Sequence, residues 1–148
     1  MKILRDETLV ALNDLTVACR EAAHRHGSAA EMSDDPALRD RLAALARRRE
    51  EAADRFAEAM IARDDIPGAP SEELELLEAA ATKLRSVLGS DETREALRDC
   101  LKKEQRLAEA AAAALRHDLD PRLRETVGAL HADTAAEIAL LQREAGQD

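Results

Sequence analysis

Mainly apolar residues recur at alternating intervals of three and four along the chain, the spacing that places side chains on one face of an α-helix. Five segments show this pattern, at roughly residues 6–32, 36–62, 71–88, 91–117 and 121–145. The first of these faces consists of Thr8, Leu12, Leu15, Cys19, Ala22, His26 and Ala29. We therefore expect five amphipathic helices that pack side by side.

The composition supports helices and argues against strands. Phe56 is the only aromatic residue, and Val and Ile are scarce beside Ala, Leu, Glu and Arg. At 148 residues the chain has the length of one domain. The sequence thus predicts an all-α fold, with residues 1–148 forming a single bundle domain around a thin core of Leu and Ala. We expect a second subunit to cover part of the remaining apolar surface.

Several short motifs mark the ends of the expected helices. Asp35-Pro36 and Asp120-Pro121 each offer an acidic N-cap followed by proline at the first helical position. Residues 66–71, Ile-Pro-Gly-Ala-Pro-Ser, form a linker that ends in a capping serine. Residues 89–91, Gly-Ser-Asp, end one helix and begin the next.

The two Asp-Pro helices resemble each other beyond their first residues. Residues 35–40 and 120–125 share the pattern Asp-Pro-x-Leu-Arg-acidic, and each helix follows a long helix that contains one cysteine. Two similar hairpins joined by a crossover segment are typical of ferritin-like bundles. A second explanation is that Asp-Pro-x-Leu-Arg is simply a favourable start for a helix and therefore occurs twice. The explanation by two similar hairpins predicts an antiparallel four-helix bundle. In it, 71–88 is an additional crossover helix, and the 36–62 and 91–117 helices lie parallel.

Two segments resemble an uncharacterised bacterial family of ferritin-like domains of unknown function. Residues 7–19, Glu-Thr-Leu-Val-Ala-Leu-Asn-Asp-Leu-Thr-Val-Ala-Cys, resemble the opening of that family, and residues 100–104, Cys-Leu-Lys-Lys-Glu, resemble its third bundle helix. His131 falls where the family carries a histidine on its last helix. The resemblance covers nearly the whole chain and implies a bundle whose inward Glu and His residues bind metal. Only Glu104 and His131 match such positions, which implies a reduced site and not a full two-metal oxidase site.

The net charge and the first residues limit the partners and the cellular location that we expect. The net charge is −9, and basic residues are mixed with acidic ones without a basic cluster, so we expect neither nucleic acid nor an anionic membrane as a partner. The first residues turn charged too early for a signal peptide, and no apolar run is long enough to span a membrane. We therefore expect a cytoplasmic protein with two reduced cysteines.

One carboxylate is predicted at the centre of the bundle. Glu104 lies in the middle of the apolar face of the 91–117 helix, where a buried carboxylate needs a positive partner. Arg49 has the same place on the 36–62 helix, and each residue follows its helix start, Asp91 or Pro36, by thirteen residues. If the two helices are parallel, the side chains meet at one level. The sequence therefore predicts a buried Arg49–Glu104 ion pair, with the guanidinium where a ferritin-like protein would hold metal.

The other hypothesis is a metal site for iron or zinc. Its ligands would be Glu104 and His131, with Glu50 at the edge of the apolar face as a third ligand or else a solvent-exposed residue. His26 lies about 10 Å along the bundle from the level of Glu104, too far to share an ion with it, and we expect it to be a core histidine.

Two functional hypotheses remain for the whole chain. Glu21 and His24 form the one literal Glu-x-x-His, but both point away from the apolar face, so we expect them on the surface. No nucleophile arrangement, phosphate loop or zinc spacing is present, and nothing supports catalysis. The chain is therefore either a ferritin-like bundle that binds iron or zinc, or a non-catalytic structural or interaction bundle. In both cases we expect a homo-oligomer or a helical protein partner.

Overall fold

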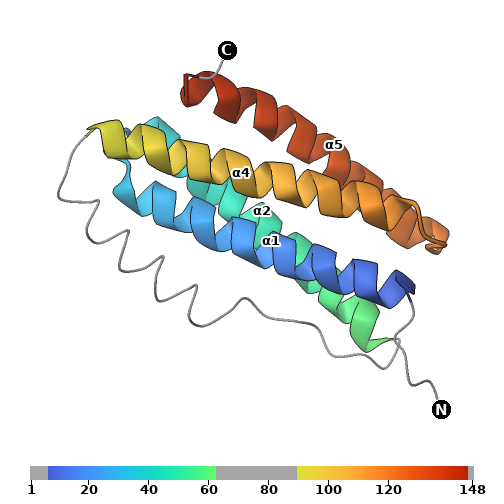
Figure 1. Cartoon of the computed structure of the whole chain (residues 1–148). Coiled ribbons are helices and arrows are strands. Elements are labelled where there is room, and N and C mark those ends of the chain that lie inside the picture. Colours follow the sequence, from blue (N-terminus) through green and yellow to red (C-terminus); the bar gives the residue numbers. More distant parts are fainter. Residues whose placement is uncertain (1–6, 63–89, 147–148) are drawn as a thin grey trace.

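The computed structural model describes residues 7–62 and 90–146, and these residues form helices. The helices are α1 (Glu7–Met32), α2 (Pro36–Ile61), α4 (Ser90–Leu115) and α5 (Pro121–Glu144) (Figure 1). This part of the chain contains no strand, so the prediction of an all-α fold is confirmed. The predicted crossover helix at 71–88, and the linker at 66–71 before it, lie outside the described residues.

The predicted helix starts at the two Asp-Pro pairs are confirmed. Asp35 is the N-cap of α2 and its Oδ1 accepts a hydrogen bond from the backbone N–H of Ala37 at 3.1 Å. Asp120 caps α5 in the same way, accepting from the N–H of Leu123 at 2.9 Å. These bonds satisfy backbone donors that have no partner within the helix.

The other helix ends match the prediction to within two residues, the usual scatter at fraying ends. Helix α4 begins at Ser90, one residue before the predicted start at Asp91, and ends at Leu115, two residues before the predicted end at His117. The guanidinium of Arg124 donates to the carbonyl oxygens of Leu115 and His117, at 2.9 and 2.6 Å. This cation therefore serves the carbonyl groups left unpaired at the end of α4.

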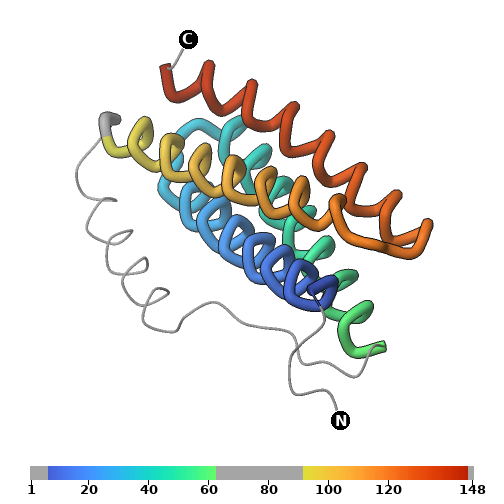
Figure 2. Tube along the Cα trace, turned by 45° about the vertical axis from the view of Figure 1, so that its right-hand side comes forward, coloured from blue at the N-terminus to red at the C-terminus, as the bar shows by residue number. Residues whose placement is uncertain are grey.

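The helices form two hairpins that lie against each other. Residues 33–35 join α1 to α2, and residues 116–120 join α4 to α5 at the opposite end of the molecule (Figure 1). Helix α1 is a neighbour of both α2 and α4, and α4 is a neighbour of α5; both views place α4 between α1 and α5 (Figure 2). Helices α2 and α5 face each other, and ion pairs between long charged side chains bridge part of the seam between them.

The apolar core consists of two clusters at different heights of the bundle. The larger contains residues 11–22 of α1, 52–60 of α2, 107–114 of α4 and 119–130 near and within α5, and includes Phe56, which is fully buried. The smaller contains Ala29, Leu42, Cys100 and Leu141 with their neighbours. Four fully or almost fully buried polar residues, one on each described helix, lie between the clusters in sequence: His26, Arg49, Glu104 and Thr134.

None of the described helices is at once long and apolar enough to cross a membrane.

Candidate functional site

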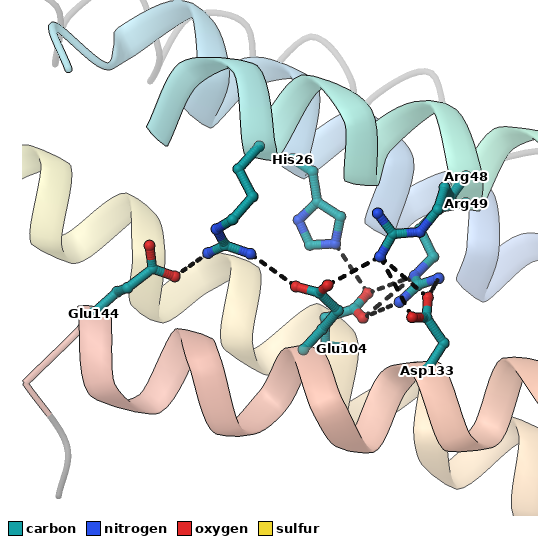
Figure 3. A network of polar contacts seen from close by, with 8 residues as sticks. His26, Arg48, Arg49, Glu104, Asp133 and Glu144 are labelled. Atoms are coloured by element: carbon teal, nitrogen blue, oxygen red, sulfur yellow. Dashed lines mark hydrogen bonds and ion pairs between the residues drawn. The ribbon is translucent and has the colours of Figure 1, made fainter. Parts of the chain in front are cut away.

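The centre of the bundle is organised around the carboxylate of Glu104, which is fully buried (Figure 3). Arg49 donates to both carboxylate oxygens: Nη2 lies 2.6 Å from Oε1, and Nε lies 3.2 Å from Oε1 and 3.0 Å from Oε2. Nε2 of His26 lies 2.9 Å from Oε2. The predicted Arg49–Glu104 ion pair is therefore confirmed, and an imidazole completes it.

Helix α5 adds a second carboxylate to this centre. The remaining guanidinium nitrogen of Arg49, Nη1, donates to Oδ2 of Asp133 at 2.7 Å. The side chain of Asp133 is 37% exposed, whereas that of Arg49 is 1% exposed, so the network reaches from the core to the surface at this point. One side chain from each of the four described helices thus meets in a single chain of contacts: His26, Glu104, Arg49 and Asp133.

Further ion pairs continue this network along the seam between α2 and α5 (Figure 3). Arg48 donates to Asp133 at 3.2 Å and to Glu137 at 2.9 Å. Arg41 donates to Glu137 at 2.8 Å and also pairs with Glu144. The side chain of Glu137 is only 10% exposed and is shared by two guanidinium groups. The seam is therefore closed by charge pairing along this stretch.

These contacts determine the charge of the two central groups. Burial raises the pKa of Glu104, but the hydrogen bonds from His26 and Arg49 and the positive charge of Arg49 outweigh burial, so its pKa lies below the ordinary value of 4.5. Burial lowers the pKa of Arg49, but its bonds to Glu104 and Asp133 outweigh that effect and raise it. Glu104 is thus an ionised carboxylate near neutral pH. Because such a group only accepts hydrogen bonds, Nε2 of His26 is the donor in their contact.

The expected separation of His26 from Glu104 is wrong. The thiol of Cys100 contacts the carbonyl oxygen of Arg25 at 3.9 Å, so His26 is nearly level with Cys100 and only about one turn, ~6 Å, from Glu104 along the bundle. Residue numbers fall along α1 as they rise along α4, as the further pair Glu21–Lys103 shows. Side chains lean toward the N-terminus of their own helix, so His26 and Glu104 lean toward each other and close this gap. His26 is a core histidine, as expected, and its partner is the carboxylate of Glu104.

The other proposed metal ligands lie apart from this centre. The side chain of Glu50 is 51% exposed and pairs with Arg20, which matches its solvent-exposed alternative. His131 is half-buried on α5, and its side chain forms no hydrogen bond or ion pair with the described residues. Glu104, His131 and Glu50 therefore do not form a common donor set in this arrangement. Within residues 7–62 and 90–146, no group of three or more His, Cys, Asp and Glu side chains is placed to hold a metal ion.

The expected surface position of the Glu-x-x-His pair is wrong for Glu21. Its side chain is 14% exposed and turns toward α4, where it pairs with Lys103 at 3.4 Å and with Arg106 at 3.7 Å. Its position beside the apolar face brings it to the α1–α4 contact, where long basic side chains of α4 reach it. Glu21 thus contributes to the contact between α1 and α4.

Asp133 receives bonds from both Arg48 and Arg49 but was not among the predicted site residues. Its partial exposure places it at the edge of the apolar face of α5, and a search restricted to the centre of each face passes over it. A usable signal was present: Arg41, Arg48, Glu137 and Glu144 recur at seven-residue spacing on their helices, which aligns opposite charges along one seam. Asp133 lies one turn from Glu137 in that row.

The two cysteines are buried, free thiols. Burial raises the pKa of Cys19, and likewise that of Cys100, to about 12. Both are therefore protonated near neutral pH and behave as small apolar side chains.

The polar atoms of Arg49 and Glu104 are all paired, whereas Nδ1 of His26 is buried and has no hydrogen-bond partner among the described residues. Every donor nitrogen of the Arg49 guanidinium has a carboxylate partner, and both oxygens of Glu104 are occupied. A carboxylate with a lowered pKa is not poised to exchange protons near neutral pH. No family model, curated protein or solved structure matches the chain.

Proposed function

We propose that the protein is a non-catalytic structural or interaction bundle in which the Arg49–Glu104 pair stands where a ferritin-like protein would hold a metal ion. The observation that supports this proposal is the two-pronged contact of Arg49 with Glu104, with Nη2 at 2.6 Å and Nε at 3.0 Å from the carboxylate oxygens. A cation could bind Glu104 only by displacing this guanidinium.

The network around Glu104 fixes how the helices are placed relative to one another. A buried ion pair adds little net stability over apolar residues of the same volume, but breaking one side of it is strongly destabilising. Because each of the four described helices supplies one member, His26, Arg49, Glu104 or Asp133, a slip of any helix by one residue, about 1.5 Å, would disturb a bond to the buried Arg49 or Glu104. The network thus disfavours shifted packings of the same helices.

We also infer the finer topology and setting from the sequence patterns. Helices α2 and α4 both begin at the end of the bundle near residues 33–35, the arrangement that an antiparallel ferritin-like bundle with a crossover at 71–88 requires (Figure 1). The resemblance of residues 7–19 supports membership of the uncharacterised bacterial family of ferritin-like domains. The two free thiols fit a cytoplasmic location, and the thin core fits a homo-oligomer or a helical partner.

The competing proposal is a bundle that binds iron or zinc through Glu104 and His131, with Glu50 as a third ligand. The contact between the imidazole of His26 and the carboxylate of Glu104 supports it, because His26 would add to these three a ligand type that both metals accept. It requires Arg49 to leave Glu104 and Glu50 to turn inward from Arg20.

Metal analysis separates the two proposals. The full chain is purified without chelator and its iron and zinc content is measured for the wild type, Glu104→Ala and His131→Ala. The structural proposal expects no stoichiometric metal in any of the three. One metal per chain in the wild type, lost in both variants, would establish the competing proposal and reject ours.

Substitution of Arg49 gives the stability arm of this test. Arg49→Leu leaves Glu104 buried without its guanidinium, and we expect it to lower the free energy of unfolding by about 3–5 kcal/mol in urea denaturation. Arg47→Leu is the matched control: Arg47 is exposed two residues earlier on α2, so we expect a change within about 0.5 kcal/mol. If Arg49→Leu costs no more than Arg47→Leu, the ion pair is not what holds the bundle centre.

A further inference from the structure

A groove of about 570 Å³ lies between α2 and α5, where the ion-pair network ends. Ala52 and Phe56 of α2 and Leu130 of α5 contribute apolar walls, and Arg49 and Asp133 line one end. Arg55 and Arg122 line it from opposite helices. This volume falls in the range of small-molecule sites, which combine apolar walls with a few convergent polar groups.

The arginines of α2 form a row that continues into this groove. Arg41, Arg48 and Arg55 follow one another at seven-residue spacing, about two helical turns, and so share one side of α2. The first meets Glu137 and Glu144, and the second meets Asp133 and Glu137. As numbers rise along α2, the partner numbers fall along α5.

The third arginine of the row has no carboxylate partner in the described residues. Continuing the register brings Arg55 opposite the part of α5 that contains Leu130, Thr126 and Arg122, and all three line the groove. Neither Arg55 nor Arg122 forms an ion pair with the residues that the structure describes, although Glu51 and Glu125 also line the groove. A second guanidinium thus faces the groove where the pattern of the seam would put an acid.

We propose that this groove binds a small organic anion, a carboxylate or a phosphate monoester, with an apolar body. Arg55 and Arg122 hold the anionic group, because planar guanidinium groups match the oxygens of carboxylates and phosphates in two-pronged contacts. The apolar body lies against Ala52 and Leu130. The ligand then supplies, from outside, the negative charge that Asp133, Glu137 and Glu144 supply to the rest of the row.

Titration of the ¹⁵N-labelled full chain followed by NMR tests the proposal. The probes are phenyl phosphate and phenylacetate, which present the two anionic groups on the same ring, with benzyl alcohol as the neutral control. We expect saturable shifts confined to residues 52–56 and 122–130 with at least one anion and none with the alcohol. The stronger of the two anions identifies the class of headgroup.

Matched variants separate a built site from loose surface attraction. Arg55→Gln and Arg122→Gln should each weaken binding about tenfold, the effect of losing a charged hydrogen-bond donor. Arg47→Gln removes the same charge from α2 outside the groove and should leave the affinity unchanged within about twofold. The proposal is overturned if neither anion saturates by about 10 mM, or if all three variants weaken binding equally. Circular dichroism of each variant checks that the helices are intact.

Discussion

At the residue scale, the central feature is a carboxylate held ionised inside the protein. Three hydrogen-bonding groups, Nε and Nη2 of Arg49 and Nε2 of His26, surround Glu104, and together they outweigh the cost of its burial. The contact between Arg49 and Glu104 could be predicted by counting residues from the two helix starts. The contact with His26 could not, because it depends on how α1 is placed against α4 and on the lean of both side chains.

The lowered pKa of Glu104 predicts a specific pH dependence of stability. Since its folded pKa lies below the ordinary value of 4.5, the unfolded state binds the proton first as the pH falls. The stabilisation from its ionised form is therefore complete above about pH 4.5 and is lost as the pH falls from there toward the folded pKa. Urea denaturation across this range should show the difference in free energy of unfolding between wild type and Glu104→Gln shrinking with falling pH. If the difference in free energy of unfolding stayed constant with pH, the negative charge of Glu104 would not be what stabilises the folded state.

The raised thiol pKa values predict that both cysteines are inert in the folded protein. Burial raises the pKa of Cys19 and Cys100 to about 12, so almost no thiolate is present at pH 8. We expect Ellman's reagent to react with neither thiol in the native chain and with both in denaturant, which provides the control. Rapid reaction of one thiol in native conditions would mean that its part of the core opens readily.

At the element scale, the helices are joined by two different kinds of contact. Apolar faces join α1 to α2 and α4, whereas α2 and α5 meet along a seam of ion pairs between Arg41, Arg48, Glu137 and Glu144. Helix starts could be predicted closely, because an Asp N-cap followed by proline acts within one turn. The polar seam was not predicted, because its members lie at the edges of the apolar faces, where a solvent-exposed position is the usual expectation.

Glu137 is the residue through which this seam can be tested. It accepts from Arg41 at 2.8 Å and from Arg48 at 2.9 Å, and its side chain is 10% exposed. We expect Glu137→Gln to lower the free energy of unfolding by about 1–3 kcal/mol, because two charged hydrogen bonds lose their ionic acceptor. Glu125→Gln, exposed on the same helix, should change it by less than about 0.5 kcal/mol. Equal effects in urea denaturation would mean that the seam contributes nothing beyond surface charge.

At the scale of the whole molecule, a thin core of small apolar side chains stabilises the bundle. Its two clusters lie on either side of the central ion pair along the bundle. Most buried apolar residues are Ala and Leu, and Phe56 is the only aromatic residue in the chain. It is fully buried in the larger apolar cluster. Small side chains let the helices approach closely, but each contact removes little surface from water. The stability of the molecule should therefore depend heavily on its few large apolar residues.

Phe56→Ala tests this dependence. We expect the substitution to lower the free energy of unfolding by about 3–5 kcal/mol, through lost burial and the cavity that remains. Val10→Ala removes apolar volume from a side chain that is 40% exposed and should cost less than about 1 kcal/mol. Because the chain has no Trp or Tyr, helical circular dichroism is the measure of unfolding. A small cost for Phe56→Ala would indicate that the surrounding alanines collapse into the space.

The all-α fold, the extents of four helices to within two residues and the contact of Arg49 with Glu104 could be predicted from the order of the amino acids. These depend on the spacing of apolar residues and on caps that act over a few residues of one helix. That His26 and Asp133 join this pair, and that Glu50 and His131 lie apart from it, became known from the packing of the helices. The physical reason is that contacts between helices depend on their relative rotation and offset, and shifts of a few ångströms there separate a hydrogen bond from no contact.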